Sequence, residues 1–427
     1  MSKKFYIKTF GCQMNKHDSS IITQILHDCG FEQTSDFRHA HIFIVNTCSV
    51  RKHAEQRALS YIAGLRRWRN TQGKIVAVVG CMAERLGDDI ATRLPFVDLI
   101  LGPDSYRQIG DFLNQVYQRD TKIIETSLGG ETYCGIYPKR KGISDFVTIM
   151  RGCNNFCSYC VVPYVRGRVR SRPPDDIIQE IEVLVRGGVK DIILLGQNVN
   201  EYTYNSITFA DLLKMVAEVP NVFRVRFLTS HPKDLNDATI EIVKNHRNIC
   251  EWFHLPLQSG CSRILTLMNR HYTKEMYLDM IDKIKTAIPE ATITTDVIVG
   301  FPTETEEEFA ETLTVMEEVR FDDAYMYRYS PRPGTAAYEM NSLSEDIIKR
   351  RLRTLIDFQN KIIIDKTKEM IGKQFEVLFE AEAKSGATRG KTRGNKDVIV
   401  EQTIAPGEVR DVIMREVRGR TPIGEIV

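Results

Sequence analysis

The feature that most constrains the fold is a repeated alternation of short apolar runs with longer amphipathic stretches. In the first third of the chain, four apolar runs are typical of β-strands, at residues 5–10, 41–47, 74–80 and 97–102. Helix-like stretches separate them, and strands joined by helical crossovers pair in parallel. We therefore expect a doubly wound parallel sheet over residues 1–118.

A second series of alternating units predicts a separate domain. Six further strand-like runs lie at residues 145–150, 189–199, 223–230, 252–257, 292–301 and 322–330. Six units are too few for the closed eightfold barrel, so we expect a partial (β/α)6 barrel over residues 145–370. Thr303 and Glu306 match the pattern of a capping box and predict that a helix starts there.

The remaining segments differ in composition from these two domains. Residues 119–144 are rich in Gly, Ser, Thr and charged residues, which predicts a linker. Residues 371–427 contain runs with a period of two, separated by Gly-rich turns, which predicts a small all-β domain. The expected fold class is α/β, with this all-β domain at the C-terminal end.

Composition excludes several classes of protein. The hydrophobic fraction of 42% and the charged fraction of 27% are ordinary for a globular chain. Ten cysteines in 427 residues are too few for a disulfide scaffold. No apolar run approaches the roughly 20 residues of a membrane span, and the N-terminus lacks the apolar core of a secretory signal. We therefore expect a cytosolic protein without a membrane partner.

Three cysteines occur at the ends of successive predicted strands. Cys12, Cys48 and Cys81 follow the first, second and third runs. The carboxyl ends of strands in an open parallel sheet form the ligand crevice, so these side chains can converge on one edge. The alternative is three small apolar residues in a core, because free cysteine is commonly buried. Their position at three successive strand ends favours a shared site.

A second group of cysteines has the spacing C-x3-C-x2-C. Cys153, Cys157 and Cys160 follow the first strand of the predicted barrel, at the end where such barrels hold their active sites. A structural zinc site needs a fourth ligand, and the next histidine, His231, is distant in sequence. A [4Fe–4S] cluster held by three thiolates would leave one iron open to another molecule. The spacing favours the cluster over zinc or a disulfide.

The segment RGCNNFCSYC (151–160) resembles the radical S-adenosylmethionine (SAM) superfamily. With GCQMN (11–15), LLGQNVNEY, HLPLQSG, TDVIVGFPTET and YSPRPGTAA, essentially the whole chain resembles the methylthiotransferases, and most of all their tRNA-modifying branch. The C-terminal domain is similar to a TRAM module. The resemblance implies two [4Fe–4S] clusters with catalytic cysteine ligands: an auxiliary cluster on Cys12, Cys48 and Cys81, and a radical-SAM cluster on Cys153, Cys157 and Cys160.

The resemblance also implies a reaction and its partners. SAM would bind the open iron of the radical-SAM cluster, and reduction would cleave it to a 5′-deoxyadenosyl radical. The substrate would be tRNA with an isopentenylated adenosine beside the anticodon (position 37), whose C2–H becomes C2–S–CH3. A low-potential electron donor and a sulfur donor are required, and we expect a monomer. The residues implied for SAM are Gln197, Asn198, Gln258, Asp296 and Arg328, together with the SPRPGT loop (330–335).

Two groups of basic residues are candidate RNA contacts. The first is Arg166, Arg168, Arg170 and Arg172, and the second, near the C-terminus, is Arg389, Lys391, Arg393 and Lys396. A basic loop on a β barrel can follow phosphates, although a solvated charge run is the alternative. The chain departs from the family at Val169, where an acidic residue is common, and at Cys261, where serine is common.

Other functions fit parts of this pattern. Within the same family, the substrate could be a different tRNA adenosine or a side chain of a ribosomal protein. A different class of protein, an iron–sulfur electron carrier with an RNA-binding tail, would hold clusters but would not cleave SAM.

Overall fold

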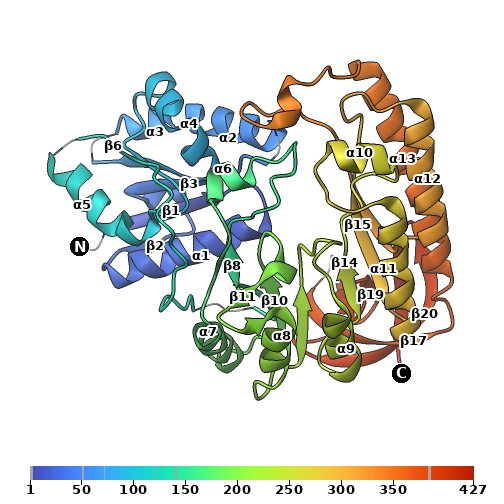
Figure 1. Cartoon of the computed structure of the whole chain (residues 1–427). Helices are drawn as coiled ribbons and strands as arrows, with labels where there is room; N and C mark the ends of the chain where they lie inside the picture. Colours follow the sequence, from blue (N-terminus) through green and yellow to red (C-terminus); the bar gives the residue numbers. More distant parts are fainter. Residues whose placement is uncertain (1–2, 51, 72, 120, 140–141, 383–385) are drawn as a thin grey trace.

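The computed structural model describes residues 3–50, 52–71, 73–119, 121–139, 142–382 and 386–427. Along the chain lie an N-terminal α/β sheet, a central arc of parallel strands with outer helices, and a small closed β barrel (Figure 1). The predicted fold class is confirmed. No helix within the described ranges is long and apolar enough to cross a membrane.

The N-terminal unit is a six-stranded parallel sheet. Its strands lie in the order β2–β1–β3–β4–β5–β6 and span Lys4–Thr9 (β1), Glu32–Gln33 (β2), Ile42–Thr47 (β3), Ile75–Gly80 (β4), Leu99–Leu101 (β5) and Ile123–Glu125 (β6). Helices cover both faces, so β3 and β4 are buried along their whole length. One face packs against α1 (Gln13–Asp28) and α5 (Ile109–Arg119), and the other against α2 (Lys52–Gly64) and α4 (Cys81–Arg93).

Two strands of this sheet were not predicted from the sequence. β2 and β6 have two and three residues, which is too short for a period to appear. β6 lies inside the stretch 119–144 that we expected to be a linker, and it pairs in parallel with β5. The N-terminal sheet therefore extends to residue 125.

The central unit is an arc of six parallel strands, as predicted. They are β7 (Ser144–Thr148), β10 (Asp191–Leu195), β13 (Arg224–Phe227), β14 (Trp252–His254), β15 (Thr292–Val299) and β16 (Asp323–Arg328). Two three-stranded ladders, β13–β10–β7 and β14–β15–β16, are joined by a parallel bridge between Val225 and Ile249. One large apolar core links these strands to the outer helices, which are α7 (Pro174–Arg186), α8 (Phe209–Ala217), α9 (Asp237–Asn245), α11 (Lys274–Ala287) and α12 (Glu306–Val319).

The start of α12 differs from the prediction by two residues. The helix is capped by Thr305, whose hydroxyl accepts a hydrogen bond from the backbone N–H of Glu308 in a complete capping box. The predicted box of Thr303 and Glu306 is wrong, because the TETEEE stretch fits the motif in two registers. Thr303 has a left-handed backbone (φ 67°) and belongs to the preceding turn.

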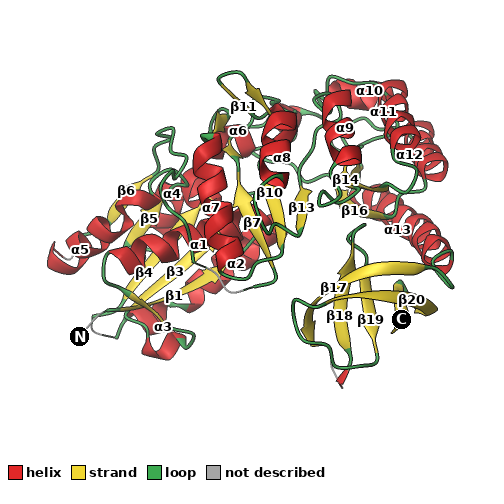
Figure 2. Cartoon of the chain, turned by 90° about the horizontal axis from the view of Figure 1, so that it is seen from below, coloured by secondary structure: helices red, strands yellow, loops and turns green. Residues whose placement is uncertain are grey.

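The C-terminal unit is a closed barrel joined to the arc by a long helix. Helix α13 (Glu345–Lys368) runs along the outside of the arc and leads into the barrel, which lies beside its end (Figure 2). The barrel order is β17–β18–β19–β21–β20, with strands at Gln374–Glu382, Thr388–Thr392, Asp397–Val400, Thr421–Ile426 and Val409–Arg418 in that order. This agrees with the expected small all-β domain.

The barrel is fastened to the arc through two buried arginines of β13. Arg226 donates hydrogen bonds to the carbonyl oxygens of Arg393 (2.6 Å) and Thr392 (2.9 Å). Arg224 donates to the carbonyl oxygen of Lys391 (2.9 Å). The side chain of Asp191 pairs with Arg226 at 2.9 Å, so that its charge is compensated. The turn between β18 and β19 is thereby held against the arc.

Candidate active site

The first three cysteines meet at the carboxyl end of the N-terminal sheet. Cys12 caps α1 directly after the β1 loop, Cys48 follows β3, and Cys81 starts α4 directly after β4. Because β1, β3 and β4 are adjacent, the three side chains converge as predicted. A hydrogen bond with Cys48 lowers the pKa of the Cys12 thiol to about 6 and raises that of Cys48, while burial raises the pKa of Cys81.

Two glycines allow the backbone to approach these cysteines closely. A Cβ atom on Gly11 would lie 2.3 Å from Cβ of Cys48, and Gly11 has a φ of +115°. A Cβ on Gly80, with a φ of +100°, would lie 2.4 Å from the carbonyl oxygen of Thr47. Since no other residue tolerates both the conformation and the space, glycine directly before Cys12 and Cys81 is part of how the site is built.

Asn15 ties the loops of this site together, and sequence reasoning missed this role. Its amide nitrogen donates to Oδ1 of Asn46 (3.1 Å) and to the carbonyl oxygen of Thr47 (2.8 Å), next to Cys48. Its Oδ1 lies 3.5 Å from Sγ of Cys12. Asn15 is fully buried. The GCQMN motif was the available signal, because it contains this asparagine three residues after the cysteine.

The second three cysteines lie on a loop at the carboxyl end of the arc. The loop runs between β8 (Met150–Arg151) and α6 (Val162–Arg166). The amide of Asn269 donates to the carbonyl oxygens of Asn155 (3.1 Å) and Phe156 (3.0 Å), which fixes the loop between Cys153 and Cys157. Burial and the neighbouring Cys157 thiol raise the pKa of the Cys160 thiol to about 12. A buried guanidinium nitrogen of Arg270 lies 3.3 Å from Sγ of Cys157.

The two sets of three cysteines are the kind of donor that an iron–sulfur cluster uses. In a [4Fe–4S] cluster each thiolate binds a different iron, so its sulfurs converge without surrounding one point. Three thiols, a nearby cation and a loop fixed by hydrogen bonds fit that group at Cys153, Cys157 and Cys160.

Several of the residues predicted to contact a cofactor have oxygen atoms without a hydrogen-bond partner in the described part of the chain. Among the described residues, Oε1 of Gln197, Oδ1 of Asn198 and Oε1 of Gln258 are buried without a hydrogen-bond partner. Asp296 lies within β15, with Oδ2 at 3.4 Å from Nε2 of His254. Gln197 and Asn198 follow the carboxyl end of β10 and Gln258 follows that of β14, whereas Asp296 lies within β15. A bound molecule with several N–H and O–H donors would satisfy the unpaired oxygens.

Arg328, the last residue of β16, and Arg332, in the loop that follows, make different contacts. The predicted Arg328 is about half exposed and pairs with Glu345 at 2.9 Å, so its guanidinium is held at the start of α13. Arg332, in the SPRPGT loop, is buried and lies 3.6 Å from Glu55 of the N-terminal unit. Its Nε and Nη2 atoms have no partner among the described residues. The geometry therefore favours Arg332 over Arg328 as the loop's contact with a bound molecule.

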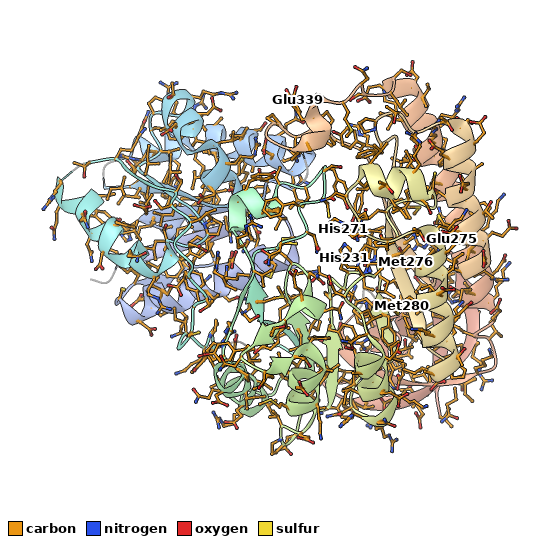
Figure 3. All side chains as sticks on the ribbon, in the orientation of Figure 1. His231, His271, Glu275, Met276, Met280 and Glu339 are labelled. Carbon is orange, nitrogen blue, oxygen red and sulfur yellow. The ribbon has the colours of Figure 1, made fainter. Side chains whose placement is uncertain are left out.

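A buried histidine lies in the same region. His231 follows β13, and Figure 3 shows it toward the middle of the molecule, near His271. Burial, together with the cation of Arg270, lowers its pKa to about 2, so the imidazole is neutral near pH 7. A neutral ring can accept a hydrogen bond at one nitrogen and donate at the other.

Two family descriptions and a set of curated proteins match the chain. Residues 147–316 match the Radical SAM superfamily, and residues 4–102 match Uncharacterized protein family UPF0004. The chain is 42% identical to the tRNA-2-methylthio-N(6)-dimethylallyladenosine synthase of Syntrophus aciditrophicus, covering 100% of this chain and 95% of that protein. It is 44% identical to the protein of the same name from Clostridium perfringens strain 13, covering 100% and 98%. The chain belongs to this synthase family.

Solved structures share the fold at low identity. The radical S-adenosylmethionine methyltransferase TsrM from Kitasatospora setae aligns over 79% of this chain and 77% of its own, with a TM-score of 0.60 at 12% identity. The cobalamin-dependent S-adenosylmethionine radical enzyme OxsB aligns over 84% and 56%, with a TM-score of 0.53 at 11% identity. The synthase family chain thus combines a radical SAM arc with an α/β N-terminal unit.

Most of the first group of predicted RNA contacts form ion pairs inside the protein. Arg166 pairs with Asp18, Arg170 with Asp104, and Arg172 with Asp176 and Glu180. Arg166 and Arg172 are also buried, with 3% and 2% of their surface exposed. These three arginines hold the fold and are not placed to meet phosphates, which corrects the prediction. Sequence spacing showed the charges but could not show the buried carboxylates opposite them.

Arg168 is the exposed member of that group. Its guanidinium lies over the ring of Phe156, 4.3 Å from the centroid. Phe156 in turn meets the ring of Tyr164 edge-on at 5.8 Å, and Tyr164 is 52% exposed. The region of the second three cysteines therefore presents an exposed cation and two aromatic rings.

The C-terminal basic residues also differ in their availability. Arg393 makes a two-point ion pair with Glu251, with nitrogen–oxygen distances of 2.9 and 2.6 Å, and faces the arc. Nζ of Lys391 lies 3.0 Å from Oδ1 of Asn395, and burial lowers the pKa of Lys396. Arg389 is exposed on β18. The prediction is corrected for Arg393, and it remains open for Arg389.

Proposed function

We propose that the chain is a radical SAM methylthiotransferase that converts an isopentenylated adenosine beside the tRNA anticodon (position 37) to its 2-methylthio derivative. The observation that carries this proposal is the pair of three-cysteine sites, each at the carboxyl ends of parallel strands. Its support is the name shared by relatives that match the chain along its whole length.

The two sites correspond to the two demands of the reaction. The product differs from its substrate by a carbon–sulfur bond in place of an unactivated aromatic C–H bond. Held by Cys153, Cys157 and Cys160, a reducible [4Fe–4S] cluster with SAM would supply the 5′-deoxyadenosyl radical that can break such a bond. Abstraction of a hydrogen atom needs no general base, which agrees with a buried, neutral His231.

The chain's own residues bind and orient the reactants. We propose that the unpaired oxygens of Gln197, Asn198 and Gln258 accept hydrogen bonds from SAM, with Asp296 beside them. Asn269 keeps the cysteine loop fixed. The cation of Arg270 beside Cys157 would compensate part of the negative charge of the thiolates.

Cys12, Cys48 and Cys81 are proposed to hold a second [4Fe–4S] cluster. The support is their convergence, the glycines that make room before Cys12 and Cys81, and the buried amide of Asn15. Three protein ligands would leave room for a sulfur-containing ligand at this auxiliary site. The sulfur donor and a low-potential electron donor would be external partners.

For RNA, we propose that Arg168, Phe156 and Tyr164 form a stacking surface beside the radical site. Exposed aromatic rings and arginine planes are the groups on which unpaired bases stack. Arg389 on the closed barrel is proposed as a phosphate contact. The domain boundaries that we propose are 1–125, 145–370 and 371–427, in a monomer that acts in the cytoplasm.

The experiment that tests the function is mass spectrometry of tRNA nucleosides from cells with and without the protein. Loss of the 2-methylthio group with accumulation of isopentenyladenosine is expected when the protein is absent. An unchanged nucleoside profile would contradict the proposal. A change confined to a ribosomal protein would favour the other branch of the family.

Iron content tests the two-cluster part separately. After anaerobic reconstitution the chain should bind about eight irons, and the triple variant C12A/C48A/C81A about four. That variant should still release 5′-deoxyadenosine from SAM on reduction while forming no methylthio product. Full iron content and full methylthiolation in the triple variant would show that these cysteines are core residues.

A further inference from the structure

A single buried carboxylate links the two cysteine sites. Asp18 lies on α1, which begins directly after Cys12, and is fully buried. Its Oδ1 accepts a hydrogen bond from Arg151 at 2.6 Å, and its Oδ2 accepts one from Arg166 at 2.6 Å. Both guanidinium groups keep the pKa of Asp18 below its usual range, although burial opposes this. Both carboxylate oxygens of Asp18 therefore accept hydrogen bonds from arginines outside the N-terminal unit.

The two arginines stand on either side of the radical-SAM cysteine loop. Arg151 ends β8, just before Cys153, and Arg166 ends α6, which follows Cys160. Asp18 therefore holds both ends of this loop from a helix of the N-terminal unit. The contact fixes one three-cysteine site relative to the other.

Arg166 continues past Asp18 into the auxiliary site. Its Nε lies 3.2 Å from Sγ of Cys81, and its Nη2 lies 3.3 Å from Oδ1 of Asn15. The guanidinium is thus a cation and a hydrogen-bond donor among the three N-terminal thiols, although it comes from the other half of the chain. Arg270 likewise donates to the sulfur of Cys157, but Arg270 and Cys157 both belong to the central unit.

We propose that Arg166 is a positioning residue of the site formed by Cys12, Cys48 and Cys81, that Asp18 holds it there, and that the auxiliary site is complete only when the two halves of the chain are docked. This inference rests on the proposed function, because it concerns the second cluster.

A purely structural ion pair would have a different signature. A buried pair of opposite charges can hold two domains together without affecting a neighbouring group. A guanidinium that donates to a ligand sulfur also favours the more negative, reduced state of a cluster, because hydrogen bonds to sulfur and local charge set its potential. The reduction potential of the auxiliary cluster therefore separates the two roles.

The test uses the full chain with Cys153, Cys157 and Cys160 replaced by Ala, so that only the auxiliary cluster gives a signal. Its midpoint potential is followed by electron paramagnetic resonance during an anaerobic redox titration, and iron per chain is counted. Arg166→Gln is expected to shift the midpoint to more negative values or to lose the auxiliary iron. Arg166→Lys should shift it less. Asp18→Asn frees Arg166 but also removes a nearby negative charge, so its readout is loss of the auxiliary iron and not the direction of the shift.

The matched control is Arg170→Gln. This change removes another arginine that pairs across the two halves, at 2.9 Å from Asp104, but it leaves the guanidinium beside Cys81 in place. Its iron content and midpoint should equal those of the parent. An unshifted midpoint with full iron content in Arg166→Gln would overturn the inference, as would an equal shift in Arg170→Gln. If the wild-type chain bound only about four irons, the two-cluster proposal would fail first, and this inference with it.

Discussion

Arg389, near the start of β18, and Arg393, directly after its end, should have separate effects on RNA binding. Each phosphate contact neutralised by a protein cation contributes about 0.7 to 0.9 to the slope of log K against log salt. Arg389 is exposed, whereas the guanidinium of Arg393 is engaged by Glu251 and by the carbonyl oxygen of Ile249 at 2.7 Å. Arg389→Ala should therefore flatten the slope by about 0.7 to 0.9, and Arg393→Ala should leave it unchanged.

Arg393→Ala should instead weaken the docking of the closed barrel. Loss of a half-buried, two-point ion pair costs about 1 to 2 kcal/mol, which urea unfolding and proteolysis of the barrel would detect. The RNA measurement is fluorescence anisotropy of a labelled anticodon stem–loop between about 50 and about 200 mM salt. Arg418→Ala, an exposed arginine of β20 that pairs with Glu416, controls for the change in net charge. An equal loss of slope in Arg393→Ala and Arg389→Ala would refute the assignment of Arg393 to docking.

Three further changes test other parts of the structure. Gly11→Ala should lower the iron content from about eight to about four per chain, because its Cβ would collide with Cβ of Cys48; colorimetric iron analysis measures this, and full iron content would contradict it. Arg226→Met should destabilise the chain by about 3 to 5 kcal/mol in urea unfolding by leaving Asp191 buried and unpaired, and adding Asp191→Asn should recover part of the loss. Burial would raise the pKa of Glu180, but Arg172 and His17 outweigh it and lower the pKa to about 2. The ionised carboxylate therefore contributes on the order of 3 kcal/mol to the free energy of unfolding above about pH 4.3, and this contribution should be lost as the pH drops toward 2. Unfolding of Glu180→Gln, measured against pH, should lack this component.

The strands and the cysteine sites could be predicted because their signals are local. β3 begins with four apolar residues and β4 is apolar up to its final glycine. Sequential parallel strands are usually neighbours, so cysteines that follow these strands are expected to meet. The start of α12 was predicted two residues early because two overlapping motifs are equivalent in sequence, and only the backbone distinguishes Thr303 from Thr305.

The roles of the arginines could not be predicted for a different reason. Arg166 and Arg393 find their carboxylates at Asp18 and Glu251, 148 and 142 positions away in the chain. No periodicity connects residues at such separations, so a basic run that crosses a domain interface has the same appearance as one that faces solvent. The fold has to be known before such a run can be divided into buried pairs and exposed cations such as Arg168.

The way in which the closed barrel is docked bears on how this enzyme can evolve. Arg224 and Arg226 grip main-chain carbonyl oxygens of residues 391–393, and these oxygens are present whatever side chains occupy the turn. Substitutions at Lys391 or Thr392 therefore leave the acceptors in place. A lineage can therefore change the side chains of the surface that we propose to contact RNA, one residue at a time, while the contacts that dock the barrel are kept.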